Sequence, residues 1–292
     1  MAQERKVAKI VEGYYTQDGA GVNLHRVLSL PTVKDFDPFL MLDAFDSTNP
    51  EDYIKGFPWH PHRGIETVTY LIEGEIDHGD SLGNRGAITN GACQWMTAGS
   101  GIIHQEMPQP TPRLLGAQLW INLPKKQKMT QPAYRDIKSS LIPVVKEEGV
   151  KIRIISGEYK GAKGEIMGGA IKTTYLDVAL NPKHTWEMKT DPEETVFIYI
   201  VEGALDFEGK GEFLEDRRAV LLTKGDSFKV VAGPNGCARF LVYAAKPLGE
   251  PVAWGGPIVM NTEEELGKAF EELENGAFIK HKLPVSKDYY SK

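Results

Sequence analysis

Short runs of apolar residues that alternate with polar ones recur along most of this chain, and they predict β-strands rather than long helices. The clearest runs are residues 67–72 (Thr-Val-Thr-Tyr-Leu-Ile) and 150–155. Asn90-Gly91 is a strong tight-turn signal between such runs. Residues 37–45 are apolar on both faces and are expected to form a buried strand. The pattern predicts an all-β protein.

The strand pattern of the first half returns in the second half. Residues 70–77 resemble residues 199–206 at an offset of 129, and two later turn signals repeat at an offset of 134. Such an echo predicts two hairpin-rich β-barrels built to one plan. Residues 124–143 are rich in Lys, Gln, Ser and Pro and are expected to connect the two domains. We therefore expect an N-terminal domain over residues 1–140 and a C-terminal domain over residues 141–292.

One helix is predicted, close to the C-terminus. Thr262 and Glu265 form a capping-box pattern, apolar residues follow at helical spacing, and Asn275-Gly276 is a stop signal. The apolar stripe indicates an amphipathic helix packed on the sheets. We expect it to be the last element of the C-terminal domain.

Composition narrows the class of protein. Hydrophobic residues make up 41% of the chain and charged residues 25%, which is ordinary for a globular protein, and the net charge of −6 gives no footprint for nucleic acid. Two cysteines, Cys93 and Cys237, make no disulfide framework or cysteine-rich zinc site. The N-terminus is charged where a secretory signal would be apolar, and no apolar stretch is long enough to cross a membrane. We expect a soluble, cytoplasmic protein.

Two pairs of metal-capable side chains stand at the ends of one strand-rich stretch. His60 and His62 precede it, and His104 and Glu106 follow it. Residues two apart on a strand point to the same face, so each pair can aim at one point inside a barrel. Three imidazoles and a carboxylate form a mixed set suited to a divalent first-row metal, and octahedral coordination would leave two positions open. The alternative is that these histidines are surface or packed core residues.

The internal echo predicts that only the first half carries this chemistry. The two offsets place the counterparts of the four residues at Lys189, Asp191, Ala238 and Phe240. Of the histidines, only His184 lies near them in the sequence. The second barrel is therefore expected to be a structural or regulatory partner without metal ligands.

Longer motifs around these residues carry a family resemblance. They are residues 57–71 (FPWHPHRGIETVTYL), 80–83 (DSLG), 94–106 (QWMTAGSGIIHQE), 118–124 (QLWINLP) and 254–257 (WGGP). Together they resemble the pirin family of the cupin superfamily over nearly the whole chain. The resemblance implies two cupin barrels in tandem, of the double-stranded β-helix or jelly-roll type, with metal in the N-terminal one.

Carried over by motif, the resemblance implies the metal ligands His60, His62, His104 and Glu106. It implies Fe(II) as the metal, with Mn, Ni, Cu, Co and Zn as alternatives. The general cupin pattern would also offer Glu66, four residues after His62, and counting residues puts it on the same face as the histidines. Pirin-type sites take their carboxylate from the second motif instead. Glu66 is then a candidate for orienting a ligand histidine.

Two functions of different class follow from the resemblance. The first is an enzyme of the quercetin 2,3-dioxygenase type, which opens the central ring of a flavonol or a related small aromatic substrate with dioxygen. Glu106 would then be both a ligand and the base that takes the flavonol proton. The second is a non-catalytic regulatory protein, a transcriptional co-regulator or a modulator of a metabolic enzyme, with a protein partner and no direct contact with nucleic acid or membrane.

The remaining candidates are assigned simpler roles. His78 is expected to be solvated in a turn, and Cys93 to be a packed thiol in an apolar strand. Three histidines lack a partner at ligand spacing and are expected to be structural or without a role: His25, His184 and His281. Three residues beside the ligands could wall a flat apolar substrate or pack in the core: Phe57, Trp59 and Met107.

Overall fold

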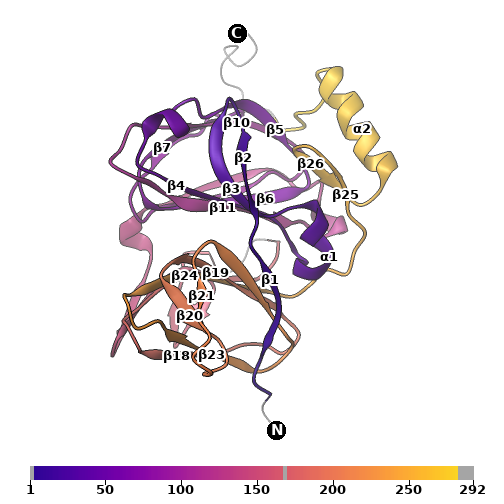
Figure 1. The fold of residues 1–292 in the computed structure, drawn as a ribbon. Helices are drawn as coiled ribbons and strands as arrows, with labels where there is room; N and C mark the ends of the chain where they lie inside the picture. The colour runs from indigo at the N-terminus through magenta and orange to yellow at the C-terminus, as the bar shows by residue number, and fades with distance from the viewer. Residues whose placement is uncertain (1–2, 167–169, 282–292) are drawn as a thin grey trace. The chain divides into compact units, whose positions relative to one another are not determined.

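The structure, a computed structural model, describes residues 3–166 and 170–281 and consists mainly of β-strands (Figure 1). The strands form two barrels, each containing a seven-stranded and a four-stranded sheet. Both sheet plans are the same, since each strand of one barrel has a counterpart at the same place in the other. The predictions of an all-β protein and of two barrels built to one plan are confirmed.

The N-terminal barrel carries the two histidine-containing strands. Its seven-stranded sheet runs in the order β12 (Ala133–Ile137), β9 (Cys93–Thr97), β6 (Ile65–Glu73), β11 (Leu114–Asn122), β4 (Phe39–Ser47), β3 (Val22–Leu28) and β2 (Tyr14–Asp18). Its four-stranded sheet runs in the order β5 (Phe57–His62), β10 (Ile102–Pro108), β7 (Ile76–Asp80) and β8 (Arg85–Ile88). A short hairpin follows late in the chain, β25 (Ala253–Gly255) with β26 (Ile258–Met260).

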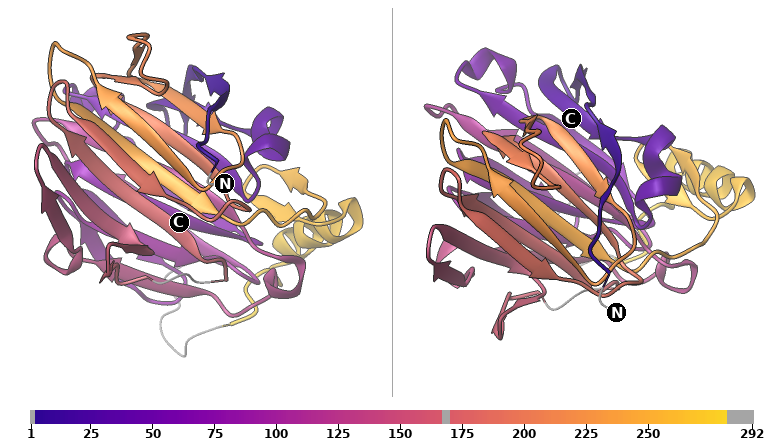
Figure 2. Two further views of the ribbon diagram at one scale, coloured as in Figure 1. Left: turned by 90° about the horizontal axis from the view of Figure 1, so that it is seen from below. Right: turned by 60° about the horizontal axis from the view of Figure 1, so that its bottom comes forward.

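The C-terminal barrel repeats this order. Its larger sheet contains β1 (Val7–Val11), β22 (Arg218–Leu222), β19 (Thr195–Glu202), β24 (Ala238–Ala245), β17 (Thr173–Leu180), β14 (Val150–Ser156) and β13 (Val144–Glu147). Its smaller sheet contains β18 (Thr185–Lys189), β23 (Ser227–Ala232), β20 (Ala204–Asp206) and β21 (Leu214–Glu215), and a separate hairpin pairs β15 (Glu158–Tyr159) with β16 (Ala162–Lys163). Figure 2 shows the long strands of the larger sheet side by side.

The echo in the sequence corresponds to one hairpin in each barrel. Residues 70–77 run from β6 into β7, and residues 199–206 run from β19 into β20. Each hairpin turns at a glycine with positive φ, 113° at Gly74 and 79° at Gly203, which other residues rarely adopt. The repeated glycine is therefore required by the turn.

The chain forms two compact units, and the main division between them lies at residues 139–140. The N-terminal barrel unit comprises residues 15–24, 39–139 and 249–281, and the C-terminal barrel unit comprises the described parts of residues 3–14, 25–38 and 140–248. Residues 249–281 thus pack with the N-terminal barrel unit, although they follow the C-terminal barrel in the sequence. Helix α2 (Glu263–Glu274) packs on β25 and β26, and its buried Leu266 and Ala269 join their apolar cluster.

The stretch predicted to connect the domains, residues 124–143, is not a free linker along its whole length. Within it, Ala133–Ile137 form the strand β12, which pairs with β9 along five residues. Lys128 in the same stretch is buried. The polar composition reflects an edge strand, whose outer face meets solvent, rather than a free linker.

Helical structure is sparse. The shorter helices are η1 (Leu30–Thr32), α1 (Val33–Phe36), η2 (Pro50–Asp52), η3 (Lys125–Gln127) and η4 (Ser139–Leu141). The capping box predicted for α2 is present, since the Thr262 hydroxyl accepts from the Glu265 amide at 3.1 Å and a Glu265 carboxylate oxygen accepts from the Thr262 amide at 3.2 Å. Across the described part of the chain, no helix is long and apolar enough to cross a membrane.

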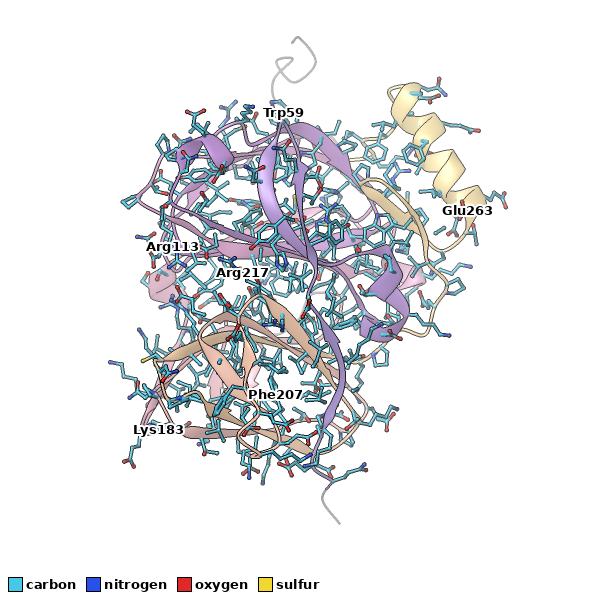
Figure 3. The ribbon with its side chains drawn as sticks, viewed as in Figure 1. Trp59, Arg113, Lys183, Phe207, Arg217 and Glu263 are labelled. Atoms are coloured by element: carbon cyan, nitrogen blue, oxygen red, sulfur yellow. The ribbon has the colours of Figure 1, made fainter. Side chains whose placement is uncertain are left out.

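The two barrels differ in what fills them. The C-terminal barrel has a large apolar core that includes Trp186, Phe228 and Phe240, and Phe207 belongs to the same cluster (Figure 3). In the N-terminal barrel an apolar cluster around Leu71 accompanies many buried polar side chains on β6, β10 and β11. Buried polar groups need partners, so the N-terminal barrel is the place to look for chemistry.

Candidate metal centre

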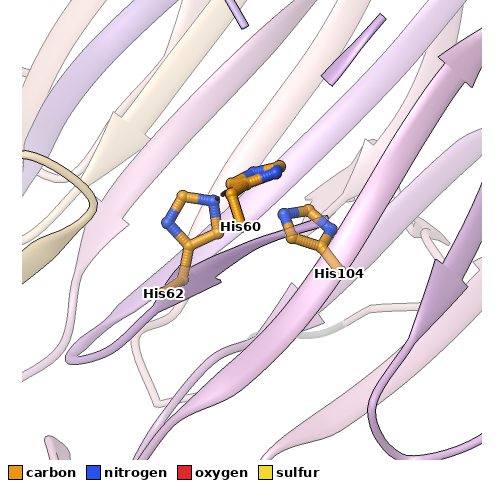
Figure 4. Close-up of side chains that lie close together, drawn as sticks. All are labelled: His60, His62 and His104. Carbon is orange, nitrogen blue, oxygen red and sulfur yellow. Dashed lines mark hydrogen bonds between the residues drawn. The ribbon is translucent and has the colours of Figure 1, made fainter. Parts of the chain in front are cut away.

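Three histidines of the N-terminal barrel converge on one point (Figure 4). His60 and His62 lie on β5, and His104 lies on β10 directly opposite His60 in the antiparallel pair. The ring centroids are 4.3 Å apart for His60 and His104, 4.8 Å for His60 and His62, and 5.0 Å for His62 and His104. One potential ligand atom from each residue lies within 4.8 Å of the others. The three histidines that the spacing argument selects therefore lie together in the structure.

Backbone carbonyls fix which nitrogen of two of the rings faces the centre. Nδ1 of His60 lies 2.8 Å from the Pro58 carbonyl, and Nδ1 of His62 lies 3.1 Å from the Pro257 carbonyl. A carbonyl can only accept, so each Nδ1 carries the proton. In the neutral rings both Nε2 atoms then present lone pairs, and they face one another at 3.1 Å. Two opposed lone pairs repel, and a cation bound between the rings removes that repulsion.

His104 supplies an independent test of whether a metal fits. Its side chain is fully buried, and neither ring nitrogen has a hydrogen-bond partner among the described residues. An unpartnered buried polar atom costs about 1–3 kcal/mol. A metal ion bound by one of these nitrogens would offset that cost, so the three residues fit a divalent cation that takes nitrogen ligands.

The local electrostatics favour the uncharged form of two of these histidines. Burial lowers the pKa of His62 well below its usual value, and the neighbouring His60 lowers it further. Burial likewise lowers the pKa of His104, with smaller contributions from His60, His62 and His78. Imidazole binds metal only when neutral, so both rings are prepared to bind at and below neutral pH.

Glu106 shares the barrel interior but lies outside the cluster of three. It is on the same face of β10 as His104, and it is buried. The Thr69 hydroxyl donates to one of its carboxylate oxygens at 2.9 Å, and the Gln118 amide donates to the other at 2.7 Å. These two donors, on β6 and β11, hold the carboxylate in a fixed orientation. Sequence reasoning missed both of them, although the alternation of β6 places Thr69 on the inward face.

Glu66 is not on the face that the residue count suggested. It lies three residues before Thr69 on β6, which pairs regularly with β11 over this stretch, so the two side chains point to opposite faces. Its carboxylate accepts from the Thr97 hydroxyl at 2.7 Å. The count failed because Gly64, with φ of 78°, turns the chain from β5 into a different sheet. A role for Glu66 in orienting a ligand histidine finds no support here.

The prediction that His78 is solvated is wrong. His78 lies on β7, is 4% exposed, and its ring centroid is 5.5 Å from that of His104. It stacks on Tyr134 at 4.6 Å, and its Nε2 lies 3.4 Å from the Asp80 carboxylate. The Asp-rich composition around it indicated a turn, but Asp80 is buried because its carboxylate accepts from the backbone amides of Leu82 and Asn84.

The other candidates take structural places. Cys93 is buried, and burial raises the pKa of its thiol, as expected for a packed cysteine. Phe57 packs on the apolar cluster of the N-terminal barrel, at 6.5 Å from Phe45. Trp59 is 40% exposed and alternates with His60 and His62 on β5, so it points away from the centre (Figure 3).

The register of the strands identifies the true counterparts in the C-terminal barrel. Pro108 pairs with Ile76 across β10 and β7, and Ala232 pairs with Leu205 across β23 and β20. Ile76 and Leu205 occupy equivalent positions in the two repeated segments. Pro108 of β10 therefore corresponds to Ala232 of β23, and the other residues of the two strands correspond in the same order. Within β23 and β18, Phe228 lies opposite Met188.

Three of the four predicted ligand positions are apolar in the C-terminal barrel, and the fourth, the counterpart of His62, is Thr190, which pairs with Asp226. The places of His104, Glu106 and His60 are taken by Phe228, Val230 and Met188, all members of its apolar core. The four counterparts named from the sequence, Lys189, Asp191, Ala238 and Phe240, are therefore wrong, because the loops between the motifs differ in length. Among the described residues, the three-histidine group is the one cluster of three or more His, Cys, Asp or Glu side chains whose ligand atoms lie close enough to share a metal ion.

The lowered pKa values predict how the stability of the metal-free protein depends on pH. Below about pH 6.5, the ordinary pKa of histidine, His62 and His104 bind protons in the unfolded chain but stay neutral in the folded protein. The unfolded state then binds more protons, so the free energy of unfolding falls as the pH drops below this value. Urea unfolding across this range should show the decline, and His104→Gln should make it shallower. An equal decline in that variant, with His184→Gln as the control, would contradict the assignment.

Comparison with known proteins agrees with this architecture. Residues 21–121 match the pirin family model, and residues 175–279 match the pirin C-terminal cupin domain. A pirin-like protein of Caulobacter vibrioides is 44% identical over 94% of this chain and 99% of its own length. A crystal structure of quercetin 2,3-dioxygenase from Acinetobacter baumannii superposes with a TM-score of 0.86 at 31% identity, covering 94% of this chain and 99% of that one.

A more distant structure shares the fold. The bacterial pirin YhhW from Escherichia coli, in complex with nickel(II), superposes with a TM-score of 0.63 at 19% identity, over 82% of this chain and 98% of that one. The extent and identity of the Caulobacter match decide the relationship, and the two barrels and their sheet order are consistent with it. This chain belongs to the pirin family.

Proposed function

We propose that this protein is a metal-dependent dioxygenase that opens flavonols, of the quercetin 2,3-dioxygenase type. The observation that carries the proposal is the convergence of three buried or half-buried imidazoles with their hydrogen-bonding needs unmet toward the centre. The similarity to the Acinetobacter quercetin 2,3-dioxygenase supports the choice of reaction. His60, His62 and His104 would hold Fe(II), and Glu106 is proposed as the fourth ligand.

Bound there, a divalent iron would supply Lewis-acid and one-electron chemistry for the reaction of a flavonol with dioxygen. The chain's own residues must bind the flavonol, accept its hydroxyl proton and limit the access of water. We propose that the inward-facing side chains of β6 and of the neighbouring strands bind the flavonol and limit the access of water.

Apolar side chains flank the centre on the inward face. Trp120 lies edge-on to His62, with ring centroids 4.9 Å apart. Across the sheet, Trp120 and Met96 pair with Thr67 on either side, and all three share the face of Thr69. A flat aromatic substrate can pack against these side chains. The apolar side chains among them also leave less polar surface to which water could bind.

Glu106 is proposed as the group that accepts the flavonol hydroxyl proton. Its two oxygens are each held by one neutral donor, Thr69 or Gln118, so the carboxylate is oriented before substrate arrives. Pre-orientation of this kind lowers the reorganisation that proton transfer requires. Thr69 and Gln118 would thus serve as positioning residues.

The proposal predicts oxygen uptake with quercetin by protein that has been stripped of metal and reloaded anaerobically with Fe(II). Uptake should match the loss of flavonol absorbance and should disappear in His62→Ala, because one of the three imidazoles is missing. His184→Ala, which removes a histidine from the C-terminal barrel, is the matched control and should retain the rate. Absence of uptake in the wild-type protein with stoichiometric metal bound would refute the flavonol reaction.

A second prediction concerns the proton acceptor. Glu106→Gln should still bind metal through the three histidines, while the rate of flavonol loss falls by about 10²–10⁴, the usual contribution of a positioned base. Glu66→Gln, a buried carboxylate on the other face of β6, should keep the wild-type rate. Rates that are equal in wild type and Glu106→Gln would show that another group takes the proton.

A further inference from the structure

The turn that follows the ligand His62 is held by a distant part of the chain. Residues 257–278 contact His62 and Arg63 directly. They also contact Gly64 through the side chain of Lys128. The Pro257 carbonyl accepts from Nδ1 of His62, and the Val259 amide donates to the Arg63 carbonyl at 3.1 Å. We call residues 257–278 the C-terminal clamp.

Arg63 is the strongest attachment point of the clamp. Its side chain is 2% exposed, so its charge has been removed from water and needs compensating partners. Nε donates to the Ser100 carbonyl at 2.7 Å, Nη1 to the Glu272 carboxylate at 2.8 Å and Nη2 to the Phe278 carbonyl at 2.8 Å. The guanidinium also lies over the Phe278 ring, 4.2 Å from its centroid. Removing Glu272 would leave this buried charge without its anionic partner.

Gly64 and Lys128 complete the attachment. The Lys128 ammonium donates to the Gly64 carbonyl at 2.9 Å, to the Asn122 side chain at 2.7 Å and to the Val259 carbonyl at 2.9 Å. A side chain at position 64 would collide with the Val259 carbonyl, so only glycine allows this close approach. Hydrogen bonds therefore hold the backbone carbonyls of both residues that follow His62, namely Arg63 and Gly64.

The clamp also determines which nitrogen of His62 can bind metal. Because the Pro257 carbonyl holds the proton on Nδ1, Nε2 is the atom left free toward His60 and His104. Trp120 packs edge-on against the same ring, and Trp254, just before the clamp, lies 5.8 Å from Trp120. Partners of this kind, which orient a ligand without touching the metal, typically change metal affinity 10–100-fold.

We propose that the C-terminal clamp is a positioning element of the metal centre, which sets metal affinity by holding His62 with Nε2 toward His60 and His104. The Glu272–Arg63 ion pair locks the clamp, and the Pro257 carbonyl acts on the ring. This inference rests on the metal site proposed above and is independent of the reaction proposed there.

Nickel binding by the full-length, metal-free protein tests the affinity. Glu272→Gln should raise the dissociation constant for Ni²⁺ by about 10-fold, the lower end of the range for an orienting partner. Glu271→Gln removes a neighbouring exposed carboxylate from the same helix and should leave it unchanged. Titration calorimetry well below the unfolding temperature of each variant separates affinity from stability. Phe278→Leu keeps the carbonyl and removes only the ring under Arg63, so it gives a second, milder variant with a smaller expected loss.

The tautomer of His62 distinguishes positioning from a general loss of structure. Nitrogen NMR of protein labelled at histidine, without metal or substrate, should show His62 with its proton on Nδ1 in the wild type and a mixture of tautomers in Glu272→Gln. Weaker nickel binding together with this mixture would support the clamp. Unchanged nickel affinity in both variants, or weaker binding with an unchanged His62 tautomer, would overturn it, whatever the outcome with quercetin.

Discussion

The structure depends on one electrostatic constraint, the approach of two imidazole lone pairs inside a barrel from which water is largely excluded. His60 and His62 each give their Nδ1 proton to a carbonyl, and the opposed Nε2 atoms lie 3.1 Å apart. Beside them His104 is buried with both ring nitrogens lacking partners in the described chain. Such an arrangement is unfavourable on its own and becomes favourable when a cation binds. Much of the N-terminal barrel can be understood as the means of holding these rings in place.

A comparison of the two barrels shows which additional contacts the histidine cluster requires. Both barrels share one sheet order, yet the C-terminal barrel has Phe228 and Met188 where the N-terminal barrel has His104 and His60. An apolar interior is stabilised by packing alone and needs no external partners. The polar interior needs Thr69 and Gln118 for Glu106, and it needs the C-terminal clamp for His62. Extra contacts therefore gather around the barrel that contains the histidine cluster.

Sequence alone predicted the parts of this site that depend on local periodicity. Two histidines separated by one residue on a strand must share a face, so the sequence predicts that His60 and His62 lie together, and the echo of residues 70–77 in residues 199–206 predicts the duplication. Contacts between distant segments were not predictable in the same way. The role of residues 257–278 depends on packing against a turn almost two hundred residues earlier, and no local pattern records it.

The errors have equally physical origins. Counting residues from His62 puts Glu66 on the wrong face, because the alternation of side chains is interrupted at Gly64, where the chain passes from one sheet into another. The acidic neighbours of His78 predict an exposed turn, but Asp80 is buried, with its carboxylate accepting hydrogen bonds from backbone amides. The polar composition of residues 133–137 predicts a linker, but an edge strand needs only one apolar face, and these residues form such a strand.

The most direct test of the account is diffraction from nickel-loaded crystals, measured at the nickel absorption edge. The account predicts a single anomalous peak between His60, His62 and His104, and none in the C-terminal barrel. A peak at other residues, or no peak there in protein that holds one nickel per chain, would contradict it.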